Sequence, residues 1–330
     1  MIKYVNYYPI TIIIPKYSFS QDKLFLRNLS YFCTMLRMTV SRNMRYFSNN
    51  SQVKCKRLEK KVAIVTASTN GIGYSIAKRL AQEGAKVMIS SRKESNVKKA
   101  VDELLQEGLS VAGTVCHVGK AEERKKLFDE TISVFGGLDI LVSNAAVNPQ
   151  VGPVLESEEE VWDKIFDINV KCTYLLMKES LPLLKKSKLP SIIIISSITG
   201  YQPFNLFGVY SVSKTALLGL CKAAAENLST YGIRVNCIAP GIIETKFSEP
   251  VCFYNLFIFL SPQKRKLIFD ILQQLHKSES IKVATIEKIP LGRIGKPDEI
   301  SGIAAFLASD DASYITGETI IASGGMQSRL

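Results

Sequence analysis

The chain has 330 residues, 46 % of them apolar, which is enough to bury a sizeable core in one or two domains. Its net charge of +12 invites a nucleic-acid interpretation, but residues 1–58 hold ten lysines and arginines against one acid, and the other 272 residues hold 32 against 29. The basic character belongs mainly to the N-terminal segment, so it gives little support to a nucleic-acid partner.

The composition also offers little material for three other kinds of site. The richest apolar runs, 10–14 and 251–260, fall short of the roughly 18 residues of a membrane span. Seven scattered cysteines form no C-x-x-C pair, which favours separate thiols in a reducing compartment over a disulfide framework. Only two histidines are present for a zinc site or a histidine-based triad. We expect no membrane span and no metal.

Residues 1–57 form a basic leader that differs from the rest of the chain. Within it, residues 35–48 are rich in arginine and hydroxyl side chains and contain no acid, a composition typical of a mitochondrial transit peptide. A disordered tail or a misplaced start codon would explain the same segment.

From Lys61 onward, short β-branched runs alternate with longer helical patterns. Parallel strands need crossover helices, so the alternation predicts an α/β fold, namely a Rossmann-type doubly wound parallel sheet in a three-layer αβα sandwich, as a single domain over 58–330. Helices are expected from the glycine turn to about Glu83 and over 94–107. The expected strands are 62–66, 85–90, 111–116, 138–143, 191–196 and 233–238.

One segment, about 250–274, departs from this rhythm. An apolar run over 250–262 precedes an amphipathic helical pattern that ends near Lys277, where a loop over an active site is expected. A genuine lid and translated intron sequence both fit this atypical insertion.

A glycine turn, Thr66-Ala-Ser-Thr-Asn-Gly-Ile-Gly73, joins the first buried strand to a helix. Glycines let the backbone approach a pyrophosphate, whose charge is met by the helix N-terminus. Paired glycines occur in tight turns of many α/β domains, and it is the strand–turn–helix context that indicates a dinucleotide site.

The second strand ends in Ser90-Ser91-Arg92-Lys93. An NAD site usually has an acid there for the ribose 2′-hydroxyl, and an acid would repel a 2′-phosphate. A hydroxyl followed by two cations favours NADP. The alternative is a solvated basic loop.

Tyr210 and Lys214 lie four residues apart, so they share one helix face. A neighbouring ammonium favours the phenolate and is expected to lower the tyrosine pKa towards the working range of an acid–base catalyst. Ser197, at the end of a strand, could hydrogen-bond a substrate oxygen that gains negative charge. A Tyr-x-x-x-Lys pair alone is a weak signal, but with the glycine turn and this serine it predicts carbonyl–alcohol hydride transfer.

Together these motifs resemble those of the short-chain dehydrogenase/reductase superfamily over residues 58–330. The strand-four motif of that family appears as Ser143-Asn-Ala-Ala146. Its catalytic tetrad maps onto Asn169, Ser197, Tyr210 and Lys214. The resemblance implies that Lys214 also holds the nicotinamide ribose and that Asn169 positions a water that resupplies the proton.

The resemblance also implies a cofactor site and a substrate site. The expected cofactor contacts are Thr66, Ser68, Asn70, Gly71, Ile72, Gly73, Ser91, Arg92, Lys93, His117, Val118, Asn144, Ala145, Tyr210, Lys214, Pro240, Gly241, Ile243 and Thr245. The expected substrate contacts are Ser197, Phe204, Asn205 and Leu206.

Residues 115–122, 141–149 and 311–318 carry a closer resemblance to peroxisomal, tetrameric carbonyl reductases of this family that use NADPH and also reduce retinal. The C-terminal Ser328-Arg329-Leu330 is a conservative variant of the Ser-Lys-Leu address, which implies a peroxisomal import receptor as a partner. We therefore favour the peroxisome over the mitochondrion. A homotetramer is implied through helices near 158–186 and 207–231.

Three departures qualify the resemblance. Ala67 stands where the family's first glycine usually lies, and it adds a methyl group to the tight turn. His117 replaces an acid that faces adenine, so it is either an adenine contact or a polar residue at a strand end. The 250–274 insertion is not expected in the family.

The expected activity is hydride transfer from NADPH to the carbonyl of ketones or aldehydes, such as aromatic ketones, diketones or retinal, with Tyr210 as the proton donor. One alternative is a non-catalytic NADP-binding scaffold, if the insertion blocks the pocket. Another is nucleic-acid binding through the basic leader, which predicts a steep salt dependence.

Overall fold

The computed structural model describes residues 56–150, 152–204, 207–245 and 286–326, together with two short strands near the N-terminus. The chain divides into two units, Met1–Val53 and Lys54–Leu330. In the first unit, β1 (Tyr4–Tyr7) pairs antiparallel with β2 (Ile10–Ile13).

Four of the features predicted from the sequence lie outside the described residues. They are the transit-peptide pattern at 35–48, the substrate candidates Asn205 and Leu206, the insertion at 250–274, and the C-terminal Ser328-Arg329-Leu330.

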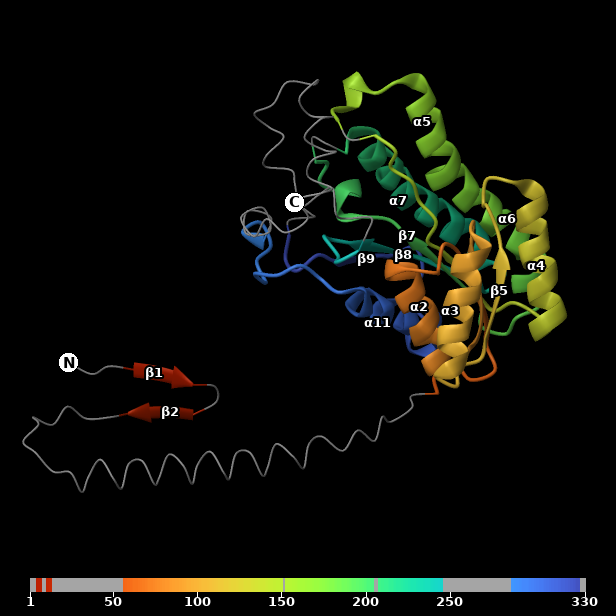
Figure 1. The fold of residues 1–330 in the computed structure, drawn as a ribbon, viewed down its shortest axis with the longest axis horizontal. Coiled ribbons are helices and arrows are strands. Elements are labelled where there is room, and N and C mark those ends of the chain that lie inside the picture. Colours follow the sequence, from red (N-terminus) through yellow and green to blue (C-terminus); the bar gives the residue numbers. More distant parts are fainter. Residues whose placement is uncertain are drawn as a thin grey trace, which may run out of the picture. The chain divides into compact units, whose positions relative to one another are not determined.

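The second unit is built on one seven-stranded parallel sheet (Figure 1). Its order is β5-β4-β3-β6-β7-β8-β9, which confirms the predicted doubly wound fold. The strands are β3 (Val62–Val65), β4 (Lys86–Ser91), β5 (Val111–Val115), β6 (Ile140–Ser143), β7 (Ser191–Ile195), β8 (Arg234–Pro240) and β9 (Thr319–Ala322). The last of these was not among the expected strands.

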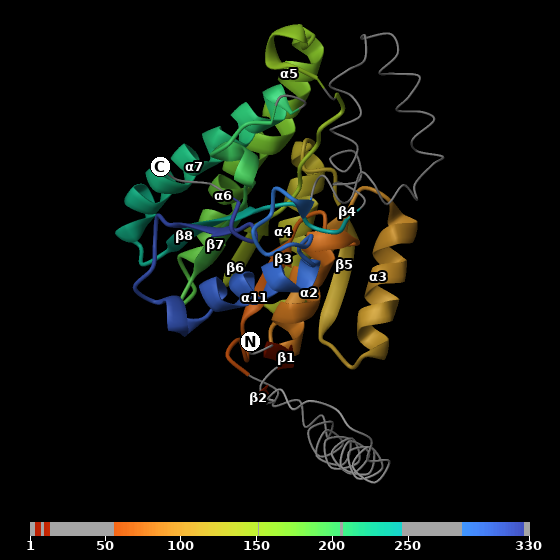
Figure 2. The same ribbon diagram turned by 90° about the vertical axis from the view of Figure 1, so that its left-hand side faces the viewer.

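Helices cover both faces of the sheet, so the central strands are buried on both sides and read as Val/Ile runs. One face packs against α2 (Gly71–Gln82), α3 (Glu94–Gln106) and α11 (Pro297–Ala308). The other packs against α4 (Ala121–Phe135), α6 (Cys172–Leu184) and α7 (Gly208–Ser229). Figure 2 shows α2 and α11 side by side in front of the sheet.

Shorter elements complete the unit. The helix α5 (Glu159–Phe166) continues through a π-helical turn, η2 (Asp167–Lys171), into α6. Three 3-10 turns are η1 (Val154–Glu156), η3 (Ile198–Gly200) and η5 (Asp310–Ala312).

The strand order locates the site. The chain moves outward from β3 to β4 and β5 and then returns to β6 on the other side of β3. Loops that leave the carboxyl ends of β3 and β6 therefore diverge, and ligands of doubly wound sheets bind in the crevice this opens. Within the described residues, no helix is long and apolar enough to cross a membrane.

Candidate active site

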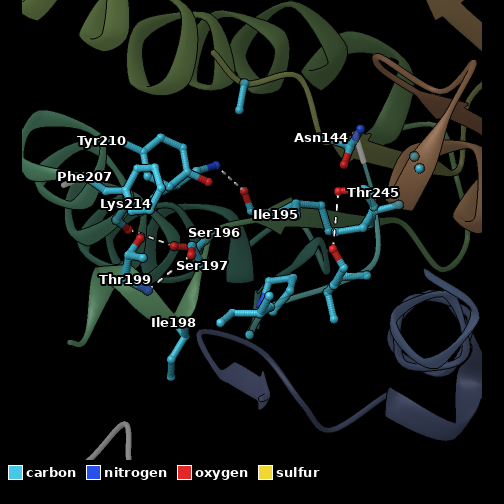
Figure 3. A pocket seen from close by; sticks show the side chains of 18 of the residues that line it. Asn144, Ile195, Ser196, Ser197, Ile198, Thr199, Phe207, Tyr210, Lys214 and Thr245 are labelled. Carbon is cyan, nitrogen blue, oxygen red and sulfur yellow. Dashed lines mark hydrogen bonds between the residues drawn. The ribbon is translucent and has the colours of Figure 1, made fainter. Parts of the chain in front are cut away.

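A cavity of about 480 Å³ opens at the carboxyl ends of β3, β6, β7 and β8. Figure 3 shows Asn144 and Thr245 at one side of it and Ser197, Tyr210 and Lys214 at the other. Its lining comprises Ala67, Asn70, Gly71, Ile72, Gly73, Asn144, Ala146, Ile195, Ser196, Ser197, Ile198, Thr199, Phe204, Phe207, Tyr210, Lys214, Pro240, Gly241, Ile242, Ile243 and Thr245. The glycine turn and the predicted acid–base pair therefore share one cavity.

The glycines of the turn are required by geometry. Gly71 has φ +58°, a left-handed conformation, and begins α2 under the Asn70 side chain, which accepts its N–H at 2.7 Å. A Cβ on Gly73 would lie 2.4 Å from Asn144 Nδ2 and 2.5 Å from the carbonyl oxygen of Ala67. Ala67 itself has φ +50°, which explains why this position favours glycine.

Thr66 and Asn144 hydrogen-bond to each other between the carboxyl ends of β3 and β6, where the strand order reverses. The Thr66 hydroxyl accepts the backbone N–H groups of Asn144 and Ala145 at 3.0 and 3.2 Å. The Asn144 side chain donates back to the carbonyls of Thr66 and Ala67 at 3.0 and 3.1 Å. Of these predicted cofactor residues, Asn144 lines the cavity, while Thr66 and Ala145 act from behind it.

The end of β4 lies outside the cavity lining. Ser68 is fully buried, donates to the Val65 carbonyl at 2.6 Å and accepts the Ser90 N–H at 3.0 Å, so it ties β3 to β4. Ser91 is half-buried, and Arg92 and Lys93 are exposed just before α3. Their charges face solvent beside the cavity and remain available to an anion.

The loop after β5 carries His117 and Val118, which also lie outside the cavity lining. His117 Nδ1 accepts the Gly119 N–H at 3.1 Å, and the Glu123 carboxylate accepts the backbone N–H of His117 at 2.6 Å. Val118 is buried. Because Nδ1 is an acceptor, the neutral His117 ring carries its proton on Nε2.

Ser197 and Tyr210 meet inside the cavity. Ser197 follows β7 and caps η3, and its hydroxyl accepts the Thr199 N–H at 3.1 Å. It also hydrogen-bonds the Tyr210 phenol. Burial raises the pKa of Tyr210 above its ordinary value, and the Ser197 hydrogen bond offsets part of that rise.

Lys214 is buried below Tyr210 on the same face of α7. Its Nζ donates to the Ile195 carbonyl at 2.8 Å and lies 5.5 Å from the centre of the Tyr210 ring. Burial lowers the pKa of Lys214 to about 8. The sequence analysis expected Lys214 to lower the tyrosine pKa, whereas burial raises the pKa of Tyr210 in the structure.

Asn169 does not line the cavity. It is fully buried in η2, and its side chain bonds both backbone groups of Val147 in the loop after β6. A π-helical turn interrupts the regular helix ladder, a feature frequent at functional sites.

The loop after β8 closes the cavity beside the glycine turn. Four residues that the sequence analysis assigned to the cofactor line it: Pro240, Gly241, Ile243 and Thr245. The Thr245 methyl group lies 3.2 Å from where a Cβ on Gly71 would be. This contact brings the two cofactor-side loops together.

The apolar end of the cavity includes a residue that the sequence analysis missed. Phe204, a predicted substrate contact, lines this end of the cavity. Phe207 lines it too, with its ring edge-on to Tyr210, at 6.2 Å between centroids and 67° between planes. Its position three residues before Tyr210, at the start of the same helix, was the signal available. Among the described residues, no cluster of histidine, cysteine, aspartate or glutamate could hold a metal.

Residues 61–252 match the family model described as short chain dehydrogenase, and residues 269–327 match one described as Enoyl-(Acyl carrier protein) reductase. Dehydrogenase/reductase SDR family member 4 from Bos taurus is 53 % identical over 273 residues, covering 83 % of this chain and 89 % of that protein. The Homo sapiens protein of that name is 50 % identical over 273 residues, covering 83 % and 90 %.

A plant relative and a solved structure extend the comparison. Tropinone reductase-like 3 from Erythroxylum coca is 48 % identical over 275 residues, covering 83 % of this chain and 96 % of that protein. A crystal structure provisionally described as a gluconate dehydrogenase from Agrobacterium tumefaciens superposes with a TM-score of 0.72 at 26 % identity, covering 84 % of this chain and 99 % of that one.

Proposed function

The chain belongs to the short-chain dehydrogenase family, and from that premise we propose that it is an NADPH-dependent reductase of ketones and aldehydes. Membership confirms the resemblance drawn from the motifs and makes the protein an oxidoreductase of nicotinamide-cofactor type. The observation that carries the proposal is the shared cavity of Ser197, Tyr210, Lys214 and the glycine turn.

The residues present fit a nicotinamide dinucleotide. At the N-terminus of α2, Ile72 and Gly73 line one end of the cavity, where their backbone N–H groups can meet a pyrophosphate. At the other end, the Lys214 ammonium donates one of its three N–H groups to the Ile195 carbonyl. The other N–H groups can donate to ribose hydroxyls. When bound, the cofactor supplies the hydride for the carbonyl carbon.

Tyr210 is suited to deliver the proton. Its pKa lies above neutral pH, as for any phenol, so Oη carries a proton to give to a carbonyl oxygen that gains negative charge. The Ser197 hydroxyl, already bonded to that phenol, can orient and polarise the same oxygen. Lys214 then favours the phenolate that remains, which lowers the cost of the transfer.

The test uses the full chain with NADPH and an aromatic diketone or retinal, followed by the loss of NADPH absorbance. We expect Tyr210→Phe to lose roughly 10²- to 10⁴-fold in kcat, the usual worth of a general acid. Tyr314→Phe, at a fully exposed tyrosine just after η5, is the matched control and should keep its rate. Full activity in Tyr210→Phe would refute the mechanism.

The preference for NADPH is supported by the end of β4. Arg92 and Lys93 are exposed there, and Ser91 brings no acid to repel a 2′-phosphate. We expect Ser91→Asp and Arg92→Ala each to lower the NADPH-to-NADH ratio of kcat/KM by at least about tenfold, equivalent to 1.4 kcal/mol. Lys98→Ala, an exposed cation on α3, should leave the ratio unchanged.

An apolar or aromatic carbonyl substrate, retinal included, is supported by Phe204 and Phe207 at the end of the cavity that holds Tyr210. Comparison of kcat/KM for a bulky aromatic ketone and for acetone tests this preference. A smaller value for the aromatic ketone would contradict it.

We also propose a homotetramer that resides in the peroxisome. Apolar side chains that are partly exposed on α6 and α7, Tyr174 and Val212, support pairing through these helices. Sedimentation of the full chain tests the assembly.

Imaging of a fusion with Leu330 left free tests the peroxisomal location, and mitochondrial signal alone would favour targeting by the leader instead.

A further inference from the structure

The side-chain amide of Asn169 forms two hydrogen bonds with the backbone of Val147, one to its N–H and one to its carbonyl, as a backbone partner in a β-sheet would. Its Oδ1 accepts the Val147 N–H at 2.8 Å, and its Nδ2 donates to the Val147 carbonyl at 3.1 Å. The N–H of Val147 needs an acceptor, so the orientation of the amide is fixed. Asn169 therefore anchors the loop that follows β6.

The second Nδ2 proton of Asn169 points to α7, the helix that carries Tyr210 and Lys214. It is donated to Ser213 Oγ at 3.1 Å, and Ser213 donates its own proton to the Tyr210 carbonyl at 2.7 Å. Asn169 and Ser213 are both 0 % exposed. Each residue therefore donates to the next, Asn169 to Ser213 and Ser213 to Tyr210. Because the Ser213 hydroxyl accepts one of these bonds and donates the other, its orientation is fixed.

This chain of bonds connects the two walls of the cavity. The loop after β6 supplies Asn144 and Ala146 to one wall, and α7 supplies Tyr210 and Lys214 to the other. A hydrogen-bond network that is buried and fully paired holds its members rigidly, because each lost partner leaves a desolvated polar group.

We propose that Ser213 is a positioning residue that, through Asn169, holds the loop after β6 in register with the Tyr210 phenol. The consequence for catalysis rests on the proposed function, because it is read out in turnover. Ser213 touches neither substrate nor cofactor in this role, and it acts by fixing the distance between the cavity walls.

A matched control lies two residues away. Ser211 is on the same helix and 1 % exposed, and its hydroxyl has no hydrogen-bond partner among the described residues. Ser211→Ala therefore removes the same atom from the same environment without removing a bond.

The kinetic experiment is a double-mutant cycle on the full chain. We expect Ser213→Ala to lower kcat about tenfold with KM for the carbonyl within twofold, and Ser211→Ala to change neither by more than twofold. In an Asn169→Ala background, the effect of Ser213→Ala should shrink below twofold, because residues that act through one network are not additive. Additive effects, or equal effects of the two serine changes, overturn the proposal.

A second readout needs no turnover and separates this inference from the proposed function. Hydrogen exchange of a peptide spanning 144–150 should quicken in Ser213→Ala, while a peptide spanning β8 exchanges as in wild type. Ser213→Cys fills the site with a slightly larger side chain that hydrogen-bonds only weakly, and it replaces the alanine variant if that one does not fold. Unchanged exchange at 144–150 refutes the role of Ser213, whereas a wild-type chain that reduces no carbonyl refutes the proposed function alone.

Discussion

The Lys214 ammonium lies 5.5 Å from the centre of the Tyr210 ring, and both groups are buried in the same cavity wall. Burial disfavours the charged form of each, which lowers the pKa of Lys214 and raises that of Tyr210. The pair therefore holds its proton on the phenol, ready for donation, and the lysine ammonium titrates close to physiological pH.

The lowered pKa of Lys214 predicts a stability that rises with pH. The pKa is about 8 in the folded chain against an ordinary 10.5, so between these values the unfolded chain binds more protons. The free energy of unfolding therefore increases as pH rises through this window, by about 3 kcal/mol in total. Below pH 8 this contribution is absent.

Urea unfolding of wild type and Lys214→Met at pH 7 and pH 9.5 measures this effect. Methionine keeps a similar length without a charge, so the other titrating groups cancel in the difference between the two chains. We expect wild type to gain on the variant by about 2 kcal/mol across that range. A constant difference would show that Lys214 titrates at its ordinary value.

Gly73→Ala should damage the dinucleotide turn. The added Cβ would lie 2.4 Å from Asn144 Nδ2 and 2.5 Å from the Ala67 carbonyl, which forces apart the contact at the strand switch point. We expect the dissociation constant for NADPH, measured by fluorescence titration, to rise at least about tenfold. Gly219→Ala in α7, where the new Cβ would meet no described residue within 4 Å apart from its own helix neighbours, should leave it unchanged.

Ala67→Gly should act in the opposite sense. Ala67 holds φ +50°, and the left-handed region costs a residue with a Cβ roughly 1–2 kcal/mol, part of which the greater freedom of glycine in the unfolded chain cancels. We expect stabilisation of about 0.5–1 kcal/mol in chemical denaturation. Ala223→Gly, exposed on α7, should instead destabilise by about 1 kcal/mol. The same sign for both changes would rule out this account of Ala67.

The order of the strands along the chain and the position of the Tyr210–Lys214 pair could be predicted, because both follow from local sequence patterns. Buried Val/Ile runs placed β3 to β8 within a residue or two of their observed bounds, and the i, i+4 spacing placed Tyr210 and Lys214 on one face of α7. The edge strand β9 was missed because only the first of its four residues is buried and because the short turn η5 separates it from the crossover helix α11.

The properties that depend on packing could not be predicted. The directions of the pKa shifts at Tyr210 and Lys214 come from burial, which spacing along the sequence does not reveal. Phe207 enters the cavity only because α7 begins beside the loop after β6, where Gly152 and Phe207 form a bridge. Contacts between distant segments of this kind need the assembled fold.

Arg57, which the sequence analysis assigned to the leader, is bound into the folded unit. Its Nε and Nη2 both donate to the carboxylate of Glu83 at 2.8 Å, and Nη1 reaches Asp311 at 3.0 Å. Glu83 is 2 % exposed at the end of α2 and also accepts from Arg79 at 2.7 Å. Burial raises the pKa of Glu83, but the two arginines outweigh it and hold that pKa below its ordinary value.

Arg57→Ala should therefore destabilise the unit by roughly 2–3 kcal/mol, because a buried carboxylate loses two of its three bonds. A carboxyl whose folded pKa is depressed stabilises above its unfolded pKa, so the loss should be full at pH 7 and fade as pH falls through the folded value. Lys56→Ala, which breaks only an exposed pair with Glu59, should cost less than about 0.5 kcal/mol. Thermal unfolding of chains that start at residue 54 and at residue 58 gives an independent measure, and equal midpoints would show that Arg57 anchors nothing.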